Sequence, residues 1–250
     1  MTRLLLDVGN SRVKWAIARG PRLGRQRALA LGARGAIPAA ALLAALPGHL
    51  DSVRMVSVAD TGATRRLAST LRRATGAPVH ILRTTASAAG VRCGYREPWR
   101  LGADRWAAVI GAHHLFAPAR AVCVVDVGTA LTVDFVARDG RHRGGAIVPG
   151  PGLMIASLLR DTQGIRRRAA TSQAVGRTLY SRSTREAIEQ GARYAAAAFI
   201  ERALLEARRQ FGGRPELVVT GGGAPGVLPL VGGPCRLVPD LVLRGLAALG

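Results

Sequence analysis

Two stretches decide the fold of this chain: Leu4-Leu5-Leu6-Asp7-Val8-Gly9-Asn10-Ser11 near the start and Cys123-Val124-Val125-Asp126-Val127-Gly128-Thr129-Ala130 near the middle. In each, an apolar strand runs into Asp-Val-Gly and a small polar residue, and a second strand follows at residues 13–17 or 132–136. The pattern predicts a β-hairpin whose tight turn carries one carboxylate and exposed backbone N–H groups, with a glycine that lets another group approach the main chain. Two copies predict a duplicated fold whose halves face each other across a cleft, which suits a nucleotide with its metal.

The rest of the chain alternates strands with helices, which indicates a mixed α/β class. Strands are predicted at residues 3–7, 13–19, 52–58, 79–82, 121–126, 131–137, 145–148, 216–220 and 235–238. Helices are predicted at residues 38–46, 61–75, 103–115, 153–160, 184–211 and 241–249. A chain of 250 residues fits one large domain or two smaller ones. The duplicated hairpin favours two, and we expect lobes of residues 1–118 and 119–250. The weakly periodic segment 161–182 is typical of a mobile loop or lid.

Composition indicates a reducing compartment without membrane insertion. No apolar run is long enough to span a bilayer, and Asp7 interrupts the first hydrophobic stretch, so the start of the chain does not resemble a secretion signal. Cys93, Cys123 and Cys235 are scattered without a Cys-x-x-Cys spacing and cannot all pair within one chain. A structural zinc site is therefore disfavoured, and a cytoplasmic location is expected.

The formal net charge of +21 raises the question of a nucleic-acid partner, because basic surfaces release counterions from polyanions. Lys14 is the only lysine, the arginines are spread along the chain, and no aromatic residues interleave with the densest cluster at 166–168. A solvated basic surface is therefore the preferred interpretation, and attraction of anionic substrates comes second. A nucleic-acid-binding regulator is the rival hypothesis from another class.

The first hairpin contains the groups of a phosphate site. Gly9, Asn10 and Ser11 offer N–H donors and a hydroxyl, while Asp7 can hold a hydrated Mg²⁺ and Lys14 can reach a phosphate oxygen. An ordinary hairpin turn is the simpler interpretation of a single Asp-x-Gly. The repetition of the pattern favours the phosphate site.

In the second hairpin, Asp126 and Thr129 occupy the matching positions, and Thr132 and Asp134 follow on the outgoing strand. Two carboxylates this close in sequence are candidates for cation binding in a site crowded with phosphate charge. Asp134 lies on an otherwise apolar strand, so it either points inward with a function or lies on the solvated face. The solvated face is preferred from sequence.

The motif Gly102-Ala103-Asp104-Arg105-Trp106 opens an amphipathic helix between the hairpins. A carboxylate at a helix start is commonly an N-cap, and this is the preferred interpretation of the motif alone. The alternative is that Asp104 is a general base that accepts a hydroxyl proton, while Arg105 holds an anionic substrate by a two-pronged hydrogen bond.

Glycine-rich turns follow two further strands, at residues 144–152 and 220–224. Such turns bring backbone against a flat or charged ligand, and they also simply turn corners. The patterns Gly-x-x-x-x-Gly-Lys-Ser/Thr and Gly-x-Gly-x-x-Gly are absent as strand–loop–helix units. A P-loop or a dinucleotide-binding fold is therefore disfavoured.

Taken in order, five motifs resemble the type III pantothenate kinases, and the resemblance covers essentially the whole chain. The motifs are Asp7-Val8-Gly9-Asn10-Ser11, Gly102-Ala103-Asp104-Arg105, residues 126–132, residues 144–150 and Thr220-Gly221-Gly222. That family belongs to the acetate kinase, sugar kinase, Hsp70 and actin superfamily. The resemblance therefore implies an α/β, duplicated ribonuclease H-like (actin-like ATPase) fold, with two lobes of mixed sheets flanked by helices and a cleft between them.

The resemblance implies ATP-dependent phosphorylation of pantothenate to 4'-phosphopantothenate, the first step of coenzyme A biosynthesis. It also implies a cytoplasmic homodimer that needs Mg²⁺ or another divalent cation and K⁺ or NH₄⁺. The residues implied to bind ATP are Asp7, Val8, Gly9, Asn10, Ser11, Arg12, Val13, Lys14 and Thr129. Those implied to bind pantothenate are Tyr95, Gly102, Ala103, Asp104, Arg105 and, near the dimer interface, Thr184. Asp104 would be the general base, and Asp126 would bind the monovalent cation.

Three positions depart from the family pattern. Ser11 stands where threonine is frequent, Ser183 replaces a common asparagine, and Gly223 stands where a polar residue often follows the two glycines. The last departure leaves the adenine contacts open. Because the hairpins specify phosphate and not the acceptor, another small-molecule kinase or a phosphohydrolase of the same superfold is the alternative function.

Overall fold

Two sheets with the same strand order form around the two hairpins in the computed structural model, which describes residues 1–116, 120–169 and 178–249. The first has the order β3 (Arg22–Leu23), β2 (Arg12–Arg19), β1 (Thr2–Val8), β5 (Ser52–Ser57) and β6 (Val79–Ile81), with β4 (Arg27–Ala30) also paired with β2. The second has the order β11 (His142–Pro149), β10 (Ala130–Val136), β9 (Val122–Val127), β12 (Glu216–Thr220) and β13 (Arg236–Leu237). In each sheet the hairpin strands are antiparallel, and the next two strands run parallel to the first hairpin strand. The predicted duplication of a mixed α/β fold is confirmed.

The chain divides into two units, each built around one of the sheets. Unit 1 comprises Met1–Ala119, Arg138–Gly144 and Asp240–Gly250, and unit 2 comprises Arg120–Ala137 and Gly145–Pro239. This grouping assigns a mid-chain segment and the last helix to the N-terminal unit, whereas the sequence predicted one division near residue 118. The cleft between two lobes stays a prediction.

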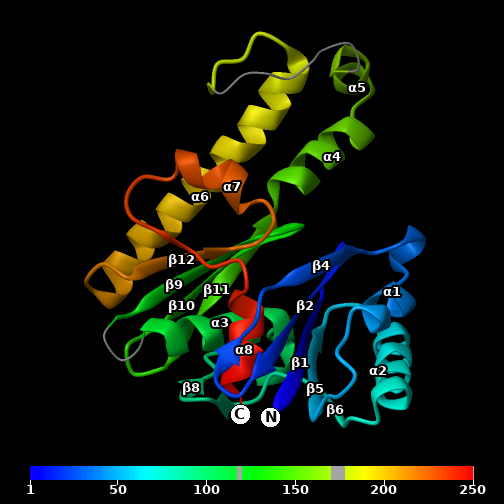
Figure 1. Cartoon of the computed structure of the whole chain (residues 1–250). Coiled ribbons are helices and arrows are strands. Elements are labelled where there is room, and N and C mark those ends of the chain that lie inside the picture. Colours follow the sequence, from blue (N-terminus) through cyan, green and yellow to red (C-terminus); the bar gives the residue numbers. More distant parts are fainter. Residues whose placement is uncertain (117–119, 170–177, 250) are drawn as a thin grey trace. The chain divides into compact units, whose positions relative to one another are not determined.

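Helices flank each sheet (Figure 1). Unit 1 contains α1 (Ala39–Ala44), α2 (Thr61–Thr75), α3 (Ala103–Phe116) and α8 (Leu241–Ala248), and a small hairpin of β7 (Ser87–Ala88) with β8 (Val91–Arg92). Unit 2 contains α4 (Pro151–Asp161), α5 (Gln163–Ala169), α6 (Thr184–Phe211) and α7 (Ala224–Val227). The six predicted helices are present. The predicted loop at 161–182 is corrected in part, because the good helix formers Gln, Arg and Ala form α5; residues 170–177 of the predicted lid lie outside the described residues.

Glycines hold α3, which carries the Gly102–Arg105 motif at its start, close against α8. A Cβ on Gly245 would lie 1.8 Å from the Ala107 carbonyl oxygen, and one on Gly111 would lie 2.4 Å from that of Leu241. Only glycine allows two helix backbones to approach so closely. The residues from Arg105 to Ala112 are all buried, so α3 is covered around its circumference rather than amphipathic as predicted.

In unit 2, one face of the sheet packs on α6, where Val125 and Val133 share a core with Ile200. Asp134 points to the opposite face and is only 2% exposed. The preferred solvated position of Asp134 is therefore wrong, because β10 is paired on both sides and its residues 133–136 are all buried. Burial, together with the nearby Asp134 charge, raises the pKa of the Cys123 thiol to about 12.

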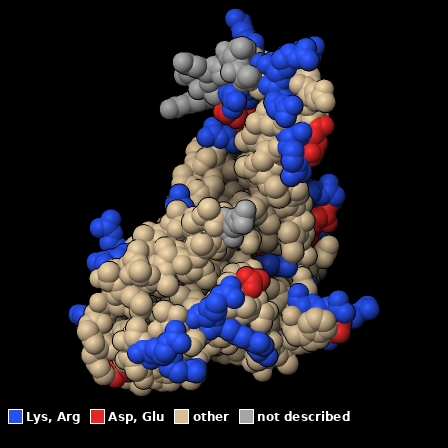
Figure 2. Space-filling model, turned by 90° about the vertical axis from the view of Figure 1, so that its right-hand side faces the viewer, with Lys and Arg blue, Asp and Glu red and all other residues tan. Residues whose placement is uncertain are grey.

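Basic side chains outnumber acidic ones on the surface (Figure 2). Figure 2 shows them in several separate groups with few acidic neighbours, as expected for 36 basic and 15 acidic residues. Ion pairs such as Arg160–Asp161 (2.8 Å) are exposed and add little stability. Within the described residues, no helix combines the length and apolarity needed to cross a bilayer.

Candidate functional site

The first hairpin places an acid beside an exposed turn. Asp7 and Lys14 are register partners, so the carboxylate and the ammonium leave the same face of the sheet. The Gly9 N–H donates to the Arg12 carbonyl oxygen (3.0 Å) and is therefore used inside the turn. The Asn10-Ser11 pair is exposed, whereas Asp7 is 8% exposed. Phosphate binding at this hairpin would rely on the exposed pair and on Lys14.

The second hairpin places Asp126 in a polar row. Asp126 pairs in register with Thr132 on β10 and with Thr220 on β12, so three polar side chains leave one face of the sheet. The Gly128 N–H donates to the Ala130 carbonyl oxygen (3.0 Å) and closes this turn. Asp126 is half-buried. Its carboxylate thus lies among hydroxyl groups, which are the hard oxygen donors that alkali and alkaline-earth cations prefer.

Two glycine turns press against this second hairpin. A Cβ on Gly221, whose φ is 97°, would lie 2.4 Å from Oδ1 of Asp126 and 2.4 Å from the Val127 carbonyl oxygen. A Cβ on Gly150 would lie 2.2 Å from the Gly128 carbonyl oxygen. Both turns therefore need glycine for their close approach to the second hairpin.

A cavity of about 640 Å³ within unit 2 is lined by these turns. Its walls include Thr129, Leu153, Arg193 and the pair Gly222-Gly223. The volume falls in the usual range for small-molecule sites, and a wall of glycine backbone with one hydroxyl and one guanidinium suits a nucleotide. The sequence predicted Thr129 but missed Arg193, because the α6 pattern does not distinguish it from the other arginines of that helix.

Asp104 lies in the first turn of α3, in unit 1. The Gly102 carbonyl accepts the Trp106 N–H (2.9 Å), so Gly102 and not Asp104 occupies the N-cap position. The Asp104 carboxylate accepts the Arg105 N–H (2.8 Å) and is half-buried. A Cβ on Gly102 would lie 2.6 Å from the same carboxylate oxygen. The preferred N-cap interpretation is therefore corrected, and glycine at position 102 leaves room for the acid.

Arg105 is the buried cation of this region, at 7% exposure. Its Nη1 donates to the Tyr95 hydroxyl (3.0 Å), and its guanidinium carbon lies 5.8 Å from the centre of that ring. Tyr95 in turn stacks on His142, with ring centres 6.0 Å apart. The structure therefore brings together the predicted Tyr95, Asp104 and Arg105.

His142 is a residue that the sequence analysis missed. It is 1% exposed, and its Nδ1 accepts the Gly94 N–H (3.4 Å). A Cβ on Gly94 would lie 2.0 Å from the His142 carbonyl oxygen, so the two segments touch through backbone. His142 enters unit 1 from mid-chain. No local sequence pattern around His142 indicates this contact, which forms between segments far apart in the chain.

Thr184 is the first residue of α6 in unit 2, after Ser183, whose hydroxyl caps the helix by accepting the Glu186 N–H (3.3 Å). The predicted site residues thus fall on both units. Among the described residues, no three His, Cys, Asp or Glu side chains cluster as a ready-made metal site. A single carboxylate such as Asp7 fits a hydrated Mg²⁺ that binds chiefly to phosphate oxygens, since Mg²⁺ is usually held by one or two carboxylates plus substrate phosphates.

Comparison with solved structures supports the fold. A protein from Sinorhizobium meliloti that is provisionally described as a 2-dehydro-3-deoxygalactonokinase superposes with a TM-score of 0.61 at 15% identity, covering 98% of this chain and 97% of the other. The activator of the 2-hydroxyisocaproyl-CoA dehydratase from Clostridium difficile, solved with ADPNP, gives a TM-score of 0.53 at 13% identity, covering 100% and 93%. At these identities the likeness concerns the fold, an actin-like ATPase and sugar-kinase architecture.

Sequence comparison identifies the family. The type III pantothenate kinase profile matches residues 3–222. Type III pantothenate kinases from Halorhodospira halophila and Nitrosococcus oceani are 42% and 36% identical to this chain, covering 98% of it in both cases and 96% and 92% of their own lengths. The chain therefore belongs to the type III pantothenate kinase family.

Proposed function

We propose that this protein transfers the γ-phosphoryl group of ATP to the primary hydroxyl of pantothenate, which produces 4'-phosphopantothenate and ADP in the first step of coenzyme A biosynthesis. The observation that carries the proposal is the placement of Asp104 beside the buried Arg105 and Tyr95 in a chain of this family. Pantothenate has a carboxylate and a hydroxyl, so it needs a cation to hold one end and a base at the other.

The acceptor side is assigned to unit 1. Asp104 accepts the proton of the pantothenate hydroxyl group while the hydroxyl oxygen of pantothenate attacks the γ-phosphorus of ATP. The bond between the γ-phosphorus and the β–γ bridging oxygen breaks, and ADP leaves. Arg105, oriented by Tyr95, binds the pantothenate carboxylate. Gly102 and Ala103 are assigned to the pantothenate pocket, and the missing side chain of Gly102 leaves space around the Asp104 carboxylate.

The nucleotide side is assigned to the hairpins and to the cavity of unit 2. Residues 7–14 and Thr129 hold the phosphates, and the glycine-walled cavity takes the nucleoside end, with Arg193 as an added contact. Asp7 binds Mg²⁺ or another divalent cation, which neutralises the transferring phosphoryl group when bound. Asp126, in its row of hydroxyl groups, binds K⁺ or NH₄⁺.

The proposed assembly is a cytoplasmic homodimer in which Thr184 contributes to the pantothenate pocket near the interface. The support for this assembly is the family resemblance of the Ser183-Thr184 position. Sedimentation of the purified chain tests the dimer: a monomer at assay concentration that turns over normally contradicts it.

A coupled assay tests the function. ADP release is followed with ATP, Mg²⁺ and pantothenate, in KCl and in NaCl, and beside a panel of other alcohol acceptors that includes sugars. We expect turnover with pantothenate and stimulation by potassium. ADP release with another acceptor but not with pantothenate would identify a different kinase, and ADP release without any acceptor would identify a phosphohydrolase.

A further inference from the structure

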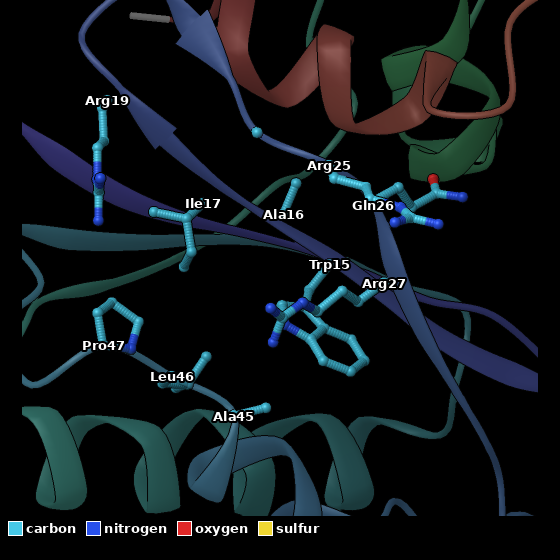
Figure 3. Close-up of a pocket in the computed structure, with 11 residues that line it drawn as sticks. Trp15, Ala16, Ile17, Arg19, Arg25, Gln26, Arg27, Ala45, Leu46 and Pro47 are labelled. Carbon is cyan, nitrogen blue, oxygen red and sulfur yellow. The ribbon is translucent and has the colours of Figure 1, made fainter.

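A second cavity, of about 600 Å³, lies within unit 1 and contains none of the residues assigned to pantothenate or ATP. It is bounded by β2, by residues 24–27, which connect β3 to β4 and begin β4, and by residues 45–47, which follow α1. Figure 3 shows these three elements around it. Its volume is in the range of small-molecule sites.

The floor of this cavity is apolar and partly aromatic. Trp15 and Ile17 lie on the same face of β2, and in Figure 3 both side chains extend to the side of the strand on which residues 45–47 lie. Trp15 is 4% exposed and belongs to the core between the first sheet and its helices, so its position is fixed. The indole is therefore almost fully covered, and the apolar surface that a ligand would meet comes mainly from the half-buried Ile17, Leu46 and Pro47.

The rim of the cavity is cationic. Arg19, Arg25 and Arg27 line it, and none of its lining residues is acidic. Arg27 is the register partner of Trp15, so the two side chains leave the same face of the sheet. In Figure 3, Arg19 lies near Pro47 at one end, whereas Arg25 lies at the other.

The arginines alone would decide nothing, because a chain with 36 basic and 15 acidic residues must leave most of its arginines without an acidic partner. The informative feature is their position around a fixed apolar floor. Within the described part of the chain, the ion pairs include none of Arg19, Arg25 and Arg27. Guanidinium groups bind phosphate and carboxylate oxygens with two parallel hydrogen bonds.

We propose that this cavity binds an organic anion in which a flat apolar or aromatic body carries a phosphate or carboxylate group. The body lies on Ile17, Leu46 and Pro47, and the anionic group pairs with Arg27 and a neighbouring arginine. A bound ligand would therefore contact β2, the second strand of the first hairpin, which also carries Lys14.

Calorimetric titration of the full chain with naphthyl phosphate tests the proposal. A non-hydrolysable ATP analogue and pantothenate are present at saturation, so that the catalytic site is blocked. We expect one binding site, and we expect Arg27→Gln to weaken it by about tenfold or more, since a hydrogen bond to a charged group contributes about 1.5–3 kcal/mol. Arg27 is exposed, so the substitution leaves the fold intact, and an unchanged melting temperature checks this.

The matched control is Arg65→Gln, which removes the same charge from an exposed position of α2. It should bind naphthyl phosphate as the unsubstituted chain does. An equal loss in both variants would reduce the effect to general electrostatics and overturn the proposal, as would no binding once the catalytic site is blocked. Inorganic phosphate that competes as well as naphthyl phosphate would also overturn it, because the apolar floor would then contribute nothing.

Discussion

The two hairpins begin from the same sequence pattern, yet the strand beside each one continues differently. Next to Asp7, β5 presents Val56, and the chain then passes through Asp60, whose carboxylate caps α2 by accepting the Ala63 N–H (2.9 Å). Next to Asp126, β12 presents Thr220, and three glycines follow. In unit 1 this turn starts a helix, whereas in unit 2 it becomes the wall of a cavity.

The comparison teaches that the duplicated sheets provide position, while the turns provide chemistry. Both units place a carboxylate one residue before the end of the first hairpin strand, at Asp7 on β1 and at Asp126 on β9. Unit 2 adds glycine surfaces suited to a nucleotide. Unit 1 adds Asp104 and Arg105 on a helix fixed by glycine packing. Substitutions in the two units should therefore alter different kinetic constants.

The largest expected effect is that of Asp104→Asn in unit 1. Loss of a general base should lower kcat by about 10²–10⁴-fold, while the affinity for an ATP analogue and the melting temperature stay unchanged. Steady-state kinetics and calorimetry measure these quantities. Near-normal kcat would leave Asp104 as a helix-terminus carboxylate and would remove the acceptor chemistry from unit 1.

In unit 2, Gly221→Ala should raise the KM for ATP by roughly tenfold to a hundredfold with little effect on the KM for pantothenate. The new Cβ would meet Asp126 and the Val127 carbonyl at 2.4 Å, and strain at a positive φ costs about 1–3 kcal/mol. Gly164→Ala, also in unit 2, is the matched control, since nothing lies within 4 Å of its Cβ position and the residue does not line the cavity. Equal effects of the two substitutions would contradict a role for close packing at residue 221.

The two hairpin acids should differ in the cation that they serve. Asp126→Ala is expected to abolish the stimulation by potassium and to leave the dependence on Mg²⁺ as it was, because Asp126 lies among hydroxyl groups of β10 and β12. Asp7→Ala should instead raise the Mg²⁺ concentration needed for half-maximal activity. Titrations of each cation at fixed ATP separate these outcomes. An unchanged potassium response in Asp126→Ala would place the monovalent cation elsewhere.

Much of the fold follows from local sequence patterns. The hairpins, the six helices and the repeated strand order are predictable because apolar periodicity and Asp-Val-Gly turns are local signals. The burial of Asp134 and of the whole circumference of α3 was not predictable, because both depend on what covers an element from far along the chain. The residue pattern of one strand or helix does not show whether another part of the chain covers its outer face.

The candidate site divides in the same way. Asp104, Arg105 and Thr129 belong to contiguous motifs and were found from sequence. Arg193 and His142 belong to no motif and reach their sites through tertiary packing. The close approaches of Gly94 and Gly221 to other backbone segments were not predictable either, because a glycine in the sequence does not show which segment lies next to it.

The smallest expected effect concerns His142 as a positioning residue on the acceptor side. Because His142 stacks on Tyr95, which accepts the hydrogen bond of Arg105, His142→Ala should raise the KM for pantothenate by about threefold to tenfold, the equivalent of one aromatic pair. His142→Phe keeps a ring against Tyr95 and loses the contact from the Gly94 N–H, so its increase should be smaller. The KM for ATP should stay constant in both variants, since nucleotide contacts are assigned elsewhere. If both variants changed the KM for ATP and for pantothenate alike, His142 would be supporting the fold of unit 1 and not the orientation of Arg105.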